Sequence, residues 1–350
     1  MALRVLQWST GRVGSACARA IAAHPNLELA GVGVYAEDKI GRDVGELTGI
    51  GALGIPAISV RTLVGVDADC VVHTPKGEFD PDATVDDICL LLSSGKNVCS
   101  TALMSLVHPR TMASEHRTKI EAACAAGGVS FFATGINPGF FADVMTLSMS
   151  GLCQRVERVH AIEIYDYSQH TSRTTVVELL KFGCDPEVAS RPRAYRVGPA
   201  EPGMQILADA MEFCIDEVKY ERQNVVAEAT FDIAATRIER GTHAGHRYIY
   251  RGLQNGVERV RFEFIGRAAP HVAPEWPAPA REGLHRWENR VYGTPNVVSS
   301  VEVGIDDPEG MAGAVATGMR AVNAIIPVCS ATPGIKTVLD LGLLRTPMVR

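Results

Sequence analysis

The first part of the chain alternates continuous apolar runs with segments whose apolar residues recur at helical spacing. Apolar runs of this kind are typical of strands buried on both faces, and the helical segments between them favour a parallel, doubly wound sheet. We therefore expect a Rossmann-type fold at the N-terminal end. The predicted strands are Leu3–Leu6, Leu27–Val34, Cys70–Val72, Asn97–Cys99 and Val129–Phe132, and the predicted helices are Val13–Ile21, Thr84–Ser94 and His116–Ala126.

The pattern changes after about residue 150, where apolar and polar residues alternate with a period of two. Such alternation predicts strands with one buried face and hence a mainly antiparallel sheet in an α+β domain. We expect strands around Ile162–Ile164, Ala227–Ala235 and Val260–Phe264, a hairpin turn at Gln254-Asn255-Gly256, and helices near Thr174–Lys181 and Gln205–Lys219. A last amphipathic helix, Met311–Ile325, should pack back on the first domain. The predicted domains are residues 1–147 together with 307–350, and residues 148–306.

A glycine-containing turn joins the first strand to the first helix. Its residues are Ser9, Thr10, Gly11, Arg12, Val13 and Gly14, and Ser9 stands at the first position of the usual G-x-G-x-x-G pattern. Glycines let the backbone approach a pyrophosphate, and the helix that starts there directs free N–H groups at the anion. The turn therefore predicts a dinucleotide site, with an ordinary strand-to-helix turn as the alternative.

The end of the second strand bears on the choice of cofactor. An acid about 20 residues beyond the glycine turn normally binds the ribose of NAD. Here Tyr35 occupies that region, with Glu37 and Asp38 just beyond it. Because Arg12 and Lys39 (or Arg42) could meet a 2′-phosphate, NADP is favoured and NAD stays open. Ligands of such sheets lie beyond the carboxyl ends of the strands, so His73, Thr74, Ser100, Thr101 and Asn137 are expected around the nicotinamide.

Composition excludes several other classes of partner. The 350 residues carry a formal net charge of −6 and no basic block, which argues against nucleic acid or an anionic membrane surface. We expect a cytoplasmic protein whose nine scattered cysteines are reduced and mostly buried. His243 and His246 have the spacing of a metal pair but lack a third ligand motif, so no metal site is predicted.

Four segments resemble one known family. They are WSTGRVG at Trp8–Gly14, KIGRDVGEL at Lys39–Leu47, ATGINPGFFADV at Ala133–Val144 and IIPVCSATPGIKTVLDL at Ile325–Leu341. Together they are similar to the dihydrodipicolinate reductase-like superfamily, within it to the branch of 2,4-diaminopentanoate dehydrogenase and native amine dehydrogenases. The resemblance implies an NAD(P)-dependent oxidoreductase, a homodimer joined through its sheet domain, and a substrate pocket between the domains.

One departure from that family concerns proton transfer. Amine dehydrogenases of this kind carry a glutamate shortly after the Ser-Thr that ends the relevant strand, whereas Ser100–Leu106 contains no carboxylate. Forming a C=N bond, or protonating the product, usually needs a positioned acid or base. His108 is one candidate, with a surface histidine at the start of a helix as the alternative. The group Tyr165, Asp166, Tyr167 and His170 is the other, with structural hydrogen bonding as the alternative. His73 is a weaker candidate for the same task.

The substrate is expected to be small and mostly apolar. Leu103, Met104, Asn137, Pro138, Phe140 and Phe141 are the predicted pocket residues, although the apolar ones fit a plain core equally well. The main hypothesis is reduction of a C=O or C=N bond, in the form of an amine dehydrogenase. The rivals are a ketone or imine reductase without ammonia chemistry, and a protein that binds NADP(H) without turnover.

Overall fold

The structure, a computed structural model, describes residues 2–190, 200–279, 285–304 and 311–347. As far as they are described, Met1–Phe140, Val197–Ile206 and Ala314–Arg350 form one compact unit (unit 1), and Phe141–Arg196 and Leu207–Gly313 form a second (unit 2). The first division lies before the predicted one at 147, and unit 1 includes a short segment ending at Ile206 that the sequence patterns gave to the second domain. The predicted division between 306 and 307 lies outside the described residues.

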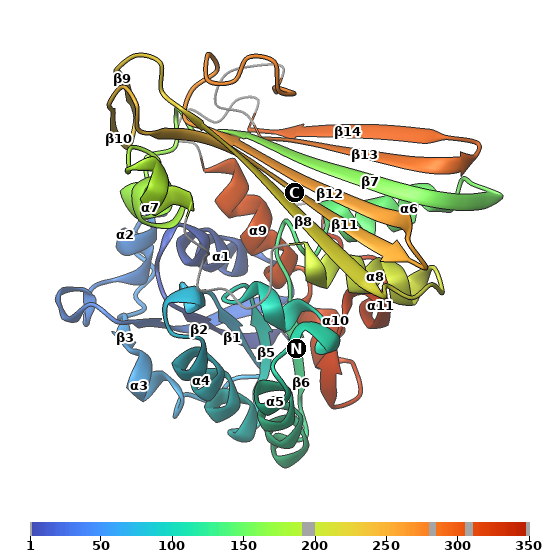
Figure 1. Ribbon diagram of the computed structural model, residues 1–350. Coiled ribbons are helices and arrows are strands. Elements are labelled where there is room, and N and C mark those ends of the chain that lie inside the picture. Colours follow the sequence, from blue (N-terminus) through green and yellow to red (C-terminus); the bar gives the residue numbers. More distant parts are fainter. Residues whose placement is uncertain (1, 191–199, 280–284, 305–310, 348–350) are drawn as a thin grey trace. The chain divides into compact units, whose positions relative to one another are not determined.

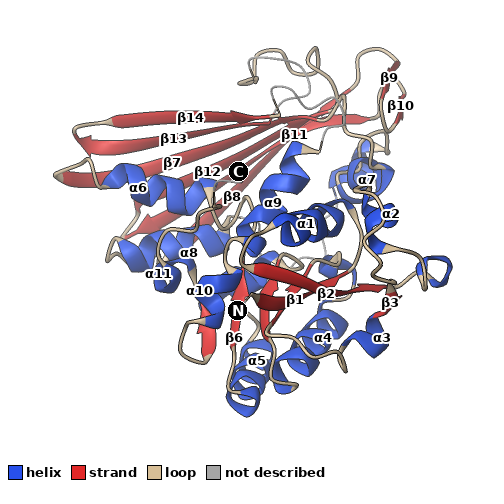
Figure 2. Cartoon of the chain, turned by 180° about the vertical axis from the view of Figure 1, so that it is seen from behind, coloured by secondary structure: helices blue, strands red, loops and turns tan. Residues whose placement is uncertain are grey.

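Unit 1 is built on a seven-stranded sheet with the order β15-β6-β5-β4-β1-β2-β3, and every neighbouring pair is parallel. In Figures 1 and 2, α3, α4 and α5 lie on one face of this sheet and α1 on the other. The doubly wound fold is therefore confirmed. Its strands are β1 (Leu3–Trp8), β2 (Leu27–Val34), β3 (Ile58–Ser59), β4 (Cys70–His73), β5 (Asn97–Ser100), β6 (Ser130–Ala133) and β15 (Gly334–Lys336).

The helices of unit 1 follow the strands in the expected alternation. They are α1 (Arg12–Ala23), α2 (Val44–Thr48), α3 (Val60–Leu63), α4 (Pro81–Ser93), α5 (Ser114–Gly127), most of α9 (Ala312–Val322), α10 (Ile325–Cys329) and α11 (Val338–Leu341), with single turns η1 (Glu37–Lys39), η2 (Gly77–Phe79), η3 (Met104–Val107) and η4 (Pro109–Thr111). The sequence pattern did not predict β15, because three residues are too few to show a period. This strand pairs in parallel with β6 and forms one edge of the sheet.

Unit 2 contains a six-stranded sheet with the order β14-β13-β7-β12-β11-β8. It is mainly antiparallel, as predicted, with one parallel pair between β7 and β12. The turn between β11 and β12 has positive φ at both Asn255 (52°) and Gly256 (75°), which confirms the predicted hairpin. The strands are β7 (Arg155–Asp166), β8 (Glu217–Val226), β11 (His243–Gln254), β12 (Val257–Arg267), β13 (His285–Thr294) and β14 (Val297–Val303).

Two predictions about the rest of unit 2 are wrong in part. Instead of one long strand over Ala227–Ala235, the chain forms a small separate hairpin of β9 (Phe231–Ile233) and β10 (Thr236–Ile238). The helix expected over Gln205–Lys219 is α8 (Glu201–Ala210), which belongs to unit 1 as far as Ile206 and to unit 2 from Leu207. The chain from Glu217 pairs with β11 as β8, because the long sheet edge overrides the local helical pattern. The remaining helical pieces are α6 (Thr146–Ser150), α7 (Pro186–Ser190) and two π-helical turns, η5 (Phe141–Met145) and η6 (Thr174–Leu179).

One described stretch has the length and hydropathy of a membrane span. Ala312–Cys329 has a mean hydropathy of 1.3 over 18 residues, with 33% of them buried. The stretch is divided into α9 and α10, contains Arg320, and buries Ile325 and Val328 completely. Because the core helix of a globular unit passes the same test of length and composition, we interpret it as a core helix of unit 1.

All nine cysteines lie within the described residues, and all are free thiols, as predicted. Four of them are buried, four are half-buried and Cys214 is exposed, so the expectation that most are buried holds only in part.

Candidate functional site

The turn after β1 has the backbone of a glycine-rich loop although it begins with serine. Ser9 has φ of 80°, in the left-handed region that normally favours glycine. Gly14 is packed tightly, since a Cβ there would lie 2.2 Å from the carbonyl oxygen of Ser9 and 2.8 Å from Thr74 Oγ1. Ser9 therefore stands in place of the first glycine of the pattern and adopts the positive φ that a glycine adopts there.

The N-terminus of α1 is open. Gly11 stands at its N-cap position, no side chain caps the first N–H groups, and a Cβ on Gly11 would meet nothing within 4 Å. The helix runs for 12 residues, so its first turn presents backbone N–H groups without a side-chain cap and the positive end of the helix dipole. Such an arrangement has room and donors for a pyrophosphate, and it fits the nicotinamide dinucleotide that the fold implies.

The buried side-chain amide of Gln7 is hydrogen-bonded to the turn. Gln7 Nε2 donates to the carbonyl oxygens of Trp8 and Ser9, each at 3.0 Å, and to Thr74 Oγ1 at 2.8 Å. Thr74 Oγ1 also contacts Ser9 Oγ at 3.1 Å. The sequence analysis overlooked Gln7. Its signal in the sequence is a single polar residue within an apolar strand, and the structure buries that residue completely.

The ends of β1 and β2 and the helical turn η1 lie next to the glycine turn. Trp8 Nε1 donates to the hydroxyl of Tyr35 at 2.7 Å, and Tyr35 is otherwise 56% exposed. Lys39 Nζ lies 3.5 Å from Thr10 Oγ1, which places its ammonium group beside the turn. Arg12 is the first residue of α1. Two cations and an aromatic ring therefore lie near this turn.

The ends of β4 and β5 carry a buried imidazole. His73 Nδ1 is hydrogen-bonded to Ser100 Oγ at 3.1 Å, and within the described residues Nε2 has no hydrogen-bond partner. Burial lowers the pKa of His73 to about 3, so its ring is neutral at physiological pH and lacks the acidic proton of an imidazolium. Its backbone carbonyl accepts the N–H of Thr101 at 3.0 Å. The positioning role of His73 is therefore better supported than acid chemistry.

The loop after β6 is fixed by an arginine far along the chain. Asn137–Pro138 is a cis peptide bond, and Gly139 has φ of 118°. Arg320 of α9 donates to the carbonyl oxygen of Gly139 at 3.0 and 3.2 Å, and its guanidinium lies 4.9 Å from the centre of the Phe140 ring. Sequence reasoning missed Arg320, whose signal was a single cation within an apolar helical stretch.

The predicted pocket residues are divided between the units. Leu103 is buried and Met104 half-buried in unit 1, where Asn137, Pro138 and Phe140 also belong. Phe141 begins unit 2 and is stacked on Trp287, with ring centres 4.0 Å apart. Asn289 Nδ2 donates to its carbonyl oxygen at 2.8 Å.

His108 is buried at the start of η4. Its Nδ1 accepts the backbone N–H of Arg110 at 3.2 Å, and its backbone carbonyl receives the N–H of Thr111 at 3.0 Å. These bonds are those of a residue that caps a helical turn, so His108 does stand at the start of a helical element, but it is buried and the expectation of a surface histidine is wrong.

The candidate group at the end of β7 forms an aromatic cluster in unit 2. Tyr165 is edge-on to Tyr167 with ring centres 4.0 Å apart, and His170 lies within 6.0 Å of both rings. His170 Nδ1 accepts the N–H of Ser172 at 3.2 Å. Asp166 is almost completely buried and accepts the N–H of Ser168 at 2.9 Å, which is a turn-stabilising bond.

Three residues that the sequence analysis did not single out, Glu163, His285 and Trp287, adjoin this cluster. His285 is stacked on Tyr165 with ring centres 3.5 Å apart and an interplanar angle of 16°. Its Nε2 lies 3.1 Å from Glu163 Oε1. The ring of Trp287 is tilted against that of His285, with ring centres 4.1 Å apart. Imidazole, carboxylate and aromatic rings are thus gathered on one stretch of β7 and β13.

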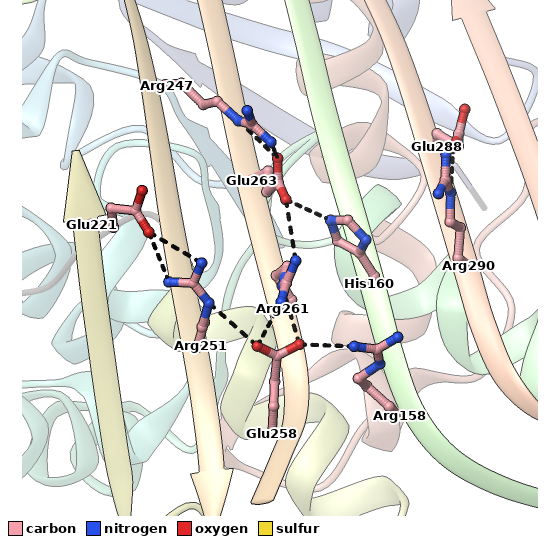
Figure 3. Close-up of polar contacts among 10 residues, drawn as sticks. All are labelled: Arg158, His160, Glu221, Arg247, Arg251, Glu258, Arg261, Glu263, Glu288 and Arg290. Carbon is pink, nitrogen blue, oxygen red and sulfur yellow. Dashed lines mark hydrogen bonds and ion pairs between the residues drawn. The ribbon is translucent and has the colours of Figure 1, made fainter. Parts of the chain in front are cut away.

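A network of ion pairs joins four strands of the unit 2 sheet, β7, β8, β11 and β12, and a separate pair of Glu288 and Arg290 lies on β13 (Figure 3). At its centre Glu263 accepts two bonds from Arg247 at 2.7 and 3.0 Å and lies 3.0 Å from His160 Nε2. Burial raises the pKa of Glu263, but Arg247 and His160 outweigh it and bring the pKa to about 2. Glu258 contacts Arg158, Arg251 and Arg261 in the same way.

His243 and His246 are buried, and His246 Nδ1 lies 3.5 Å from His243 Nε2. His246 is stacked on Phe182, and the ring of His243 is tilted against the same phenylalanine. Among the described residues no group of three or more histidine, cysteine, aspartate or glutamate side chains has the geometry of a metal site.

Comparison with known proteins now identifies the family. Residues 140–349 match the 2,4-diaminopentanoate dehydrogenase C-terminal domain. An amine dehydrogenase of Streptomyces virginiae is 31% identical over 351 aligned residues, which cover 96% of this chain and 95% of that protein. The chain belongs to this dehydrogenase family. It is therefore an NAD(P)-dependent oxidoreductase, as the sequence predicted.

Two further similarities agree. The 2,4-diaminopentanoate dehydrogenase of Acetoanaerobium sticklandii is 23% identical over 270 residues, covering 75% of this chain and 71% of that protein. The solved structure of an amine dehydrogenase from Mycobacterium smegmatis has a TM-score of 0.80 with 19% identity, covering 99% of this chain and 98% of that one. At that identity the likeness concerns the fold.

Proposed function

We propose that the protein is an amine dehydrogenase that uses NAD(P)H to convert a small, mostly apolar ketone or aldehyde and ammonia into an amine. The observation that carries this proposal is the start of α1 at Gly11, which no side chain caps and where an added Cβ would have no atom within 4 Å. The chain that contains it is 31% identical to an amine dehydrogenase. The nicotinamide supplies the hydride when it is bound, and the protein positions it and excludes water.

The residues of the turn bind the cofactor in this proposal. The N–H groups that follow Ser9, from Thr10 to Gly14, surround the pyrophosphate, and Thr74 holds the turn. His73, Ser100, Thr101 and Asn137 stand at the ends of β4, β5 and β6 and orient the nicotinamide. The neutral ring of His73 suits a hydrogen-bonding role, because its Nε2 is buried without a partner among the described residues.

NADP is the preferred cofactor in this proposal. Support comes from Lys39, whose ammonium group lies 3.5 Å from the hydroxyl of Thr10, and from Arg12 at the first position of α1. A 2′-phosphate binds well to a pair of cations, whereas the 2′-hydroxyl of NAD is usually bound by a carboxylate. Glu37 and Asp38 lie in η1 beside Lys39, so NAD remains the alternative.

The second candidate is a ketone or imine reductase without ammonia chemistry. It is favoured by one observation, the absence of a carboxylate from Ala102–Leu106. NADPH oxidation with a panel of linear and cyclic ketones and aldehydes, with and without ammonium, separates the two functions. Turnover that requires ammonium and yields amine supports the first, and ammonium-independent alcohol formation supports the second. Tight NADPH binding without turnover on the whole panel would refute both.

The protein is further proposed to be a homodimer joined through the sheet of unit 2. Support comes from the ion-pair network of Figure 3, in which positively charged arginines and negatively charged glutamates alternate over one face of the sheet. Such a face is complementary in charge to a second copy of itself. Sedimentation velocity at ~0.1 M and ~1 M salt tests this, with dissociation toward monomers expected at the higher salt. The nine free thiols suit the cytoplasm.

A further inference from the structure

The segment Lys39–Leu47 begins with the cation that the proposed function places at the 2′-phosphate, and it continues into a closed loop. The N–H of Gly41 donates to the carbonyl oxygen of Ala57 at 2.8 Å, and the N–H of Ala57 donates to the carbonyl oxygen of Arg42 at 2.8 Å. The N–H of Arg42 in turn donates to the carbonyl oxygen of Lys39 at 3.2 Å. The backbone of Lys39 is therefore bonded directly to the point at which the two ends of this loop meet.

One carboxylate holds the loop closed. Asp43 Oδ1 accepts the backbone N–H groups of Gly45 at 2.7 Å and of Leu53 at 3.0 Å. It also accepts the N–H of Glu46 at 3.2 Å, and Asp43 Oδ2 accepts the N–H of Gly54 at 2.7 Å. Two of these donors lie in the first turn of α2, and the other two lie ten and eleven residues beyond the aspartate. The side chain therefore joins the two sides of the loop.

The charge of Asp43 and the close packing around it both matter for this closure. The backbone N–H groups, that of Leu53 first, lower the pKa of Asp43, so the side chain is ionised at neutral pH and its four bonds are charge-assisted. An asparagine has a single acceptor atom in its side chain and cannot replace both carboxylate oxygens. A Cβ on Gly45 would lie 1.8 Å from the carbonyl oxygen of Gly51, so the two sides of the loop are in direct contact.

Two side-chain contacts join this region to the helix and the turn of the cofactor site. Arg19 Nη1 of α1 donates to the carbonyl oxygen of Thr48, the last residue of α2, at 2.9 Å. Lys39 is half-buried although the residues on either side of it are exposed, and its Nζ lies 3.5 Å from Thr10 Oγ1. The loop, α1 and the glycine turn all belong to unit 1, so these contacts fix the place of the ammonium group within a single unit.

We propose that Asp43 is a positioning residue of the cofactor site, which holds Lys39 beside Thr10 by closing the loop and thereby sets the preference for NADPH over NADH. This inference rests on the proposed function. The 2′-phosphate that Lys39 binds is present in NADPH and absent from NADH, so an open loop lowers the affinity for NADPH alone. A loop that only stabilises the fold would instead affect the binding of both nucleotides.

The main test measures the dissociation constants of NADPH and NADH by fluorescence titration in the wild type, Asp43→Asn, Lys39→Met and the double variant. Asp43→Asn keeps the size of the side chain and should weaken NADPH binding about tenfold, the effect of losing one charge-assisted hydrogen bond. Its affinity for NADH should stay unchanged. Lys39→Met should show the same selective loss, and the double variant should lose no more than Lys39→Met alone, because Asp43 acts through this ammonium group.

A matched control lies at the other edge of the same sheet. Asp340 Oδ2 also caps a helix of unit 1, since it accepts the N–H of Thr337 at 2.7 Å, but this helix follows β15, at the edge opposite to β3. Asp340→Asn should therefore leave the affinities for both nucleotides unchanged.

A second variant, Asp43→Ala, leaves the place between the four N–H groups open to an added carboxylate. Formate should restore part of its NADPH affinity, whereas chloride at the same ionic strength should not. Both values are taken relative to the wild type in the same buffer, which removes any competition of formate with the nucleotide.

The outcomes separate this inference from the proposed function. Unchanged NADPH affinity in Asp43→Asn, or equal losses of NADPH and NADH affinity, would overturn the role of Asp43. A double variant that loses more NADPH affinity than Lys39→Met, or an Asp43→Ala protein with the same affinity in formate and chloride, would do so as well. In all these cases a wild type that binds NADPH and forms amine leaves the function standing. A wild type that binds neither nucleotide overturns the function and this inference together.

Discussion

The ion pair at the centre of the unit 2 sheet gives a quantitative prediction. Glu263 is 3% exposed, and its pKa lies near 2 instead of the usual 4.5. A difference of about 2.5 pKa units at 1.36 kcal/mol each makes the ionised carboxylate worth about 3 kcal/mol of folding stability at pH 7. Glu263→Gln keeps the size of the side chain and removes its charge, so it should lose about that amount.

The same shift fixes how the loss depends on pH. Because the folded pKa is the lower one, the stabilisation is complete above the unfolded pKa of about 4.5 and disappears as the pH falls through 2. At pH 3 it should have decreased to about 1 kcal/mol. The difference in stability between wild type and Glu263→Gln should therefore shrink by more than half between pH 7 and pH 3.

Thermal unfolding followed by circular dichroism measures this difference. A loss of about 3 kcal/mol lowers Tm by roughly 6–12 °C in a unit of this size. Glu239→Gln is the control, since Glu239 is an exposed partner of Arg237 and its loss should leave Tm unchanged. The scans are repeated at a second protein concentration, because a Tm that does not change with concentration contains no contribution from subunit association. An equal Tm for wild type and Glu263→Gln at pH 7, or a difference of the same size at pH 3, would refute the electrostatic reasoning.

Three further variants test the cofactor turn and the loop after β6. Gly14→Ala places a Cβ 2.2 Å from the carbonyl oxygen of Ser9, so it should weaken NADPH binding at least tenfold by displacing the turn, and unchanged binding by fluorescence titration would contradict this. Arg320→Ala removes both bonds to the Gly139 carbonyl and should lower kcat with little change in the NADPH dissociation constant; steady-state kinetics with wild-type kcat would exclude a positioning role. Arg12→Ala should weaken NADPH binding more than NADH binding, and equal losses in parallel titrations would mean that Arg12 does not contact the 2′-phosphate.

Local pattern was sufficient to predict most of unit 1. The strands there are buried on both faces, so each appears as an apolar run bounded by polar or glycine residues. The β11–β12 hairpin was predictable because Asn255-Gly256 adopts positive φ more readily than other pairs. The long strand expected over Ala227–Ala235 does not form, although apolar and polar residues alternate there. The backbone of Ala227 is hydrogen-bonded to Gly241 and Thr242, and a local alternation pattern does not contain these contacts.

The candidate site was less predictable because its contacts join distant parts of the chain. Gln7 reaches Thr74 across 67 positions, Glu163 meets His285 across 122, and Arg320 meets Gly139 across 181. No pattern within a window of a few turns contains such pairs. The positive φ of Ser9 was hidden as well, since it depends on the bonds that Gln7 and Thr74 make beneath the turn.

The central claim is that the open start of α1 binds the pyrophosphate of a nicotinamide dinucleotide. Calorimetric titration of NADPH and NADH into the wild type, Gly11→Ala and Gly65→Ala tests it most directly. At both glycines φ is outside the left-handed region and a Cβ has room, so both variants should fold as the wild type does. The account predicts binding to the wild type and to Gly65→Ala, and at least tenfold weaker binding to Gly11→Ala, whose methyl group fills the space for the phosphate. Equal affinity of all three proteins, or no binding of either nucleotide at about 1 mM, would contradict it.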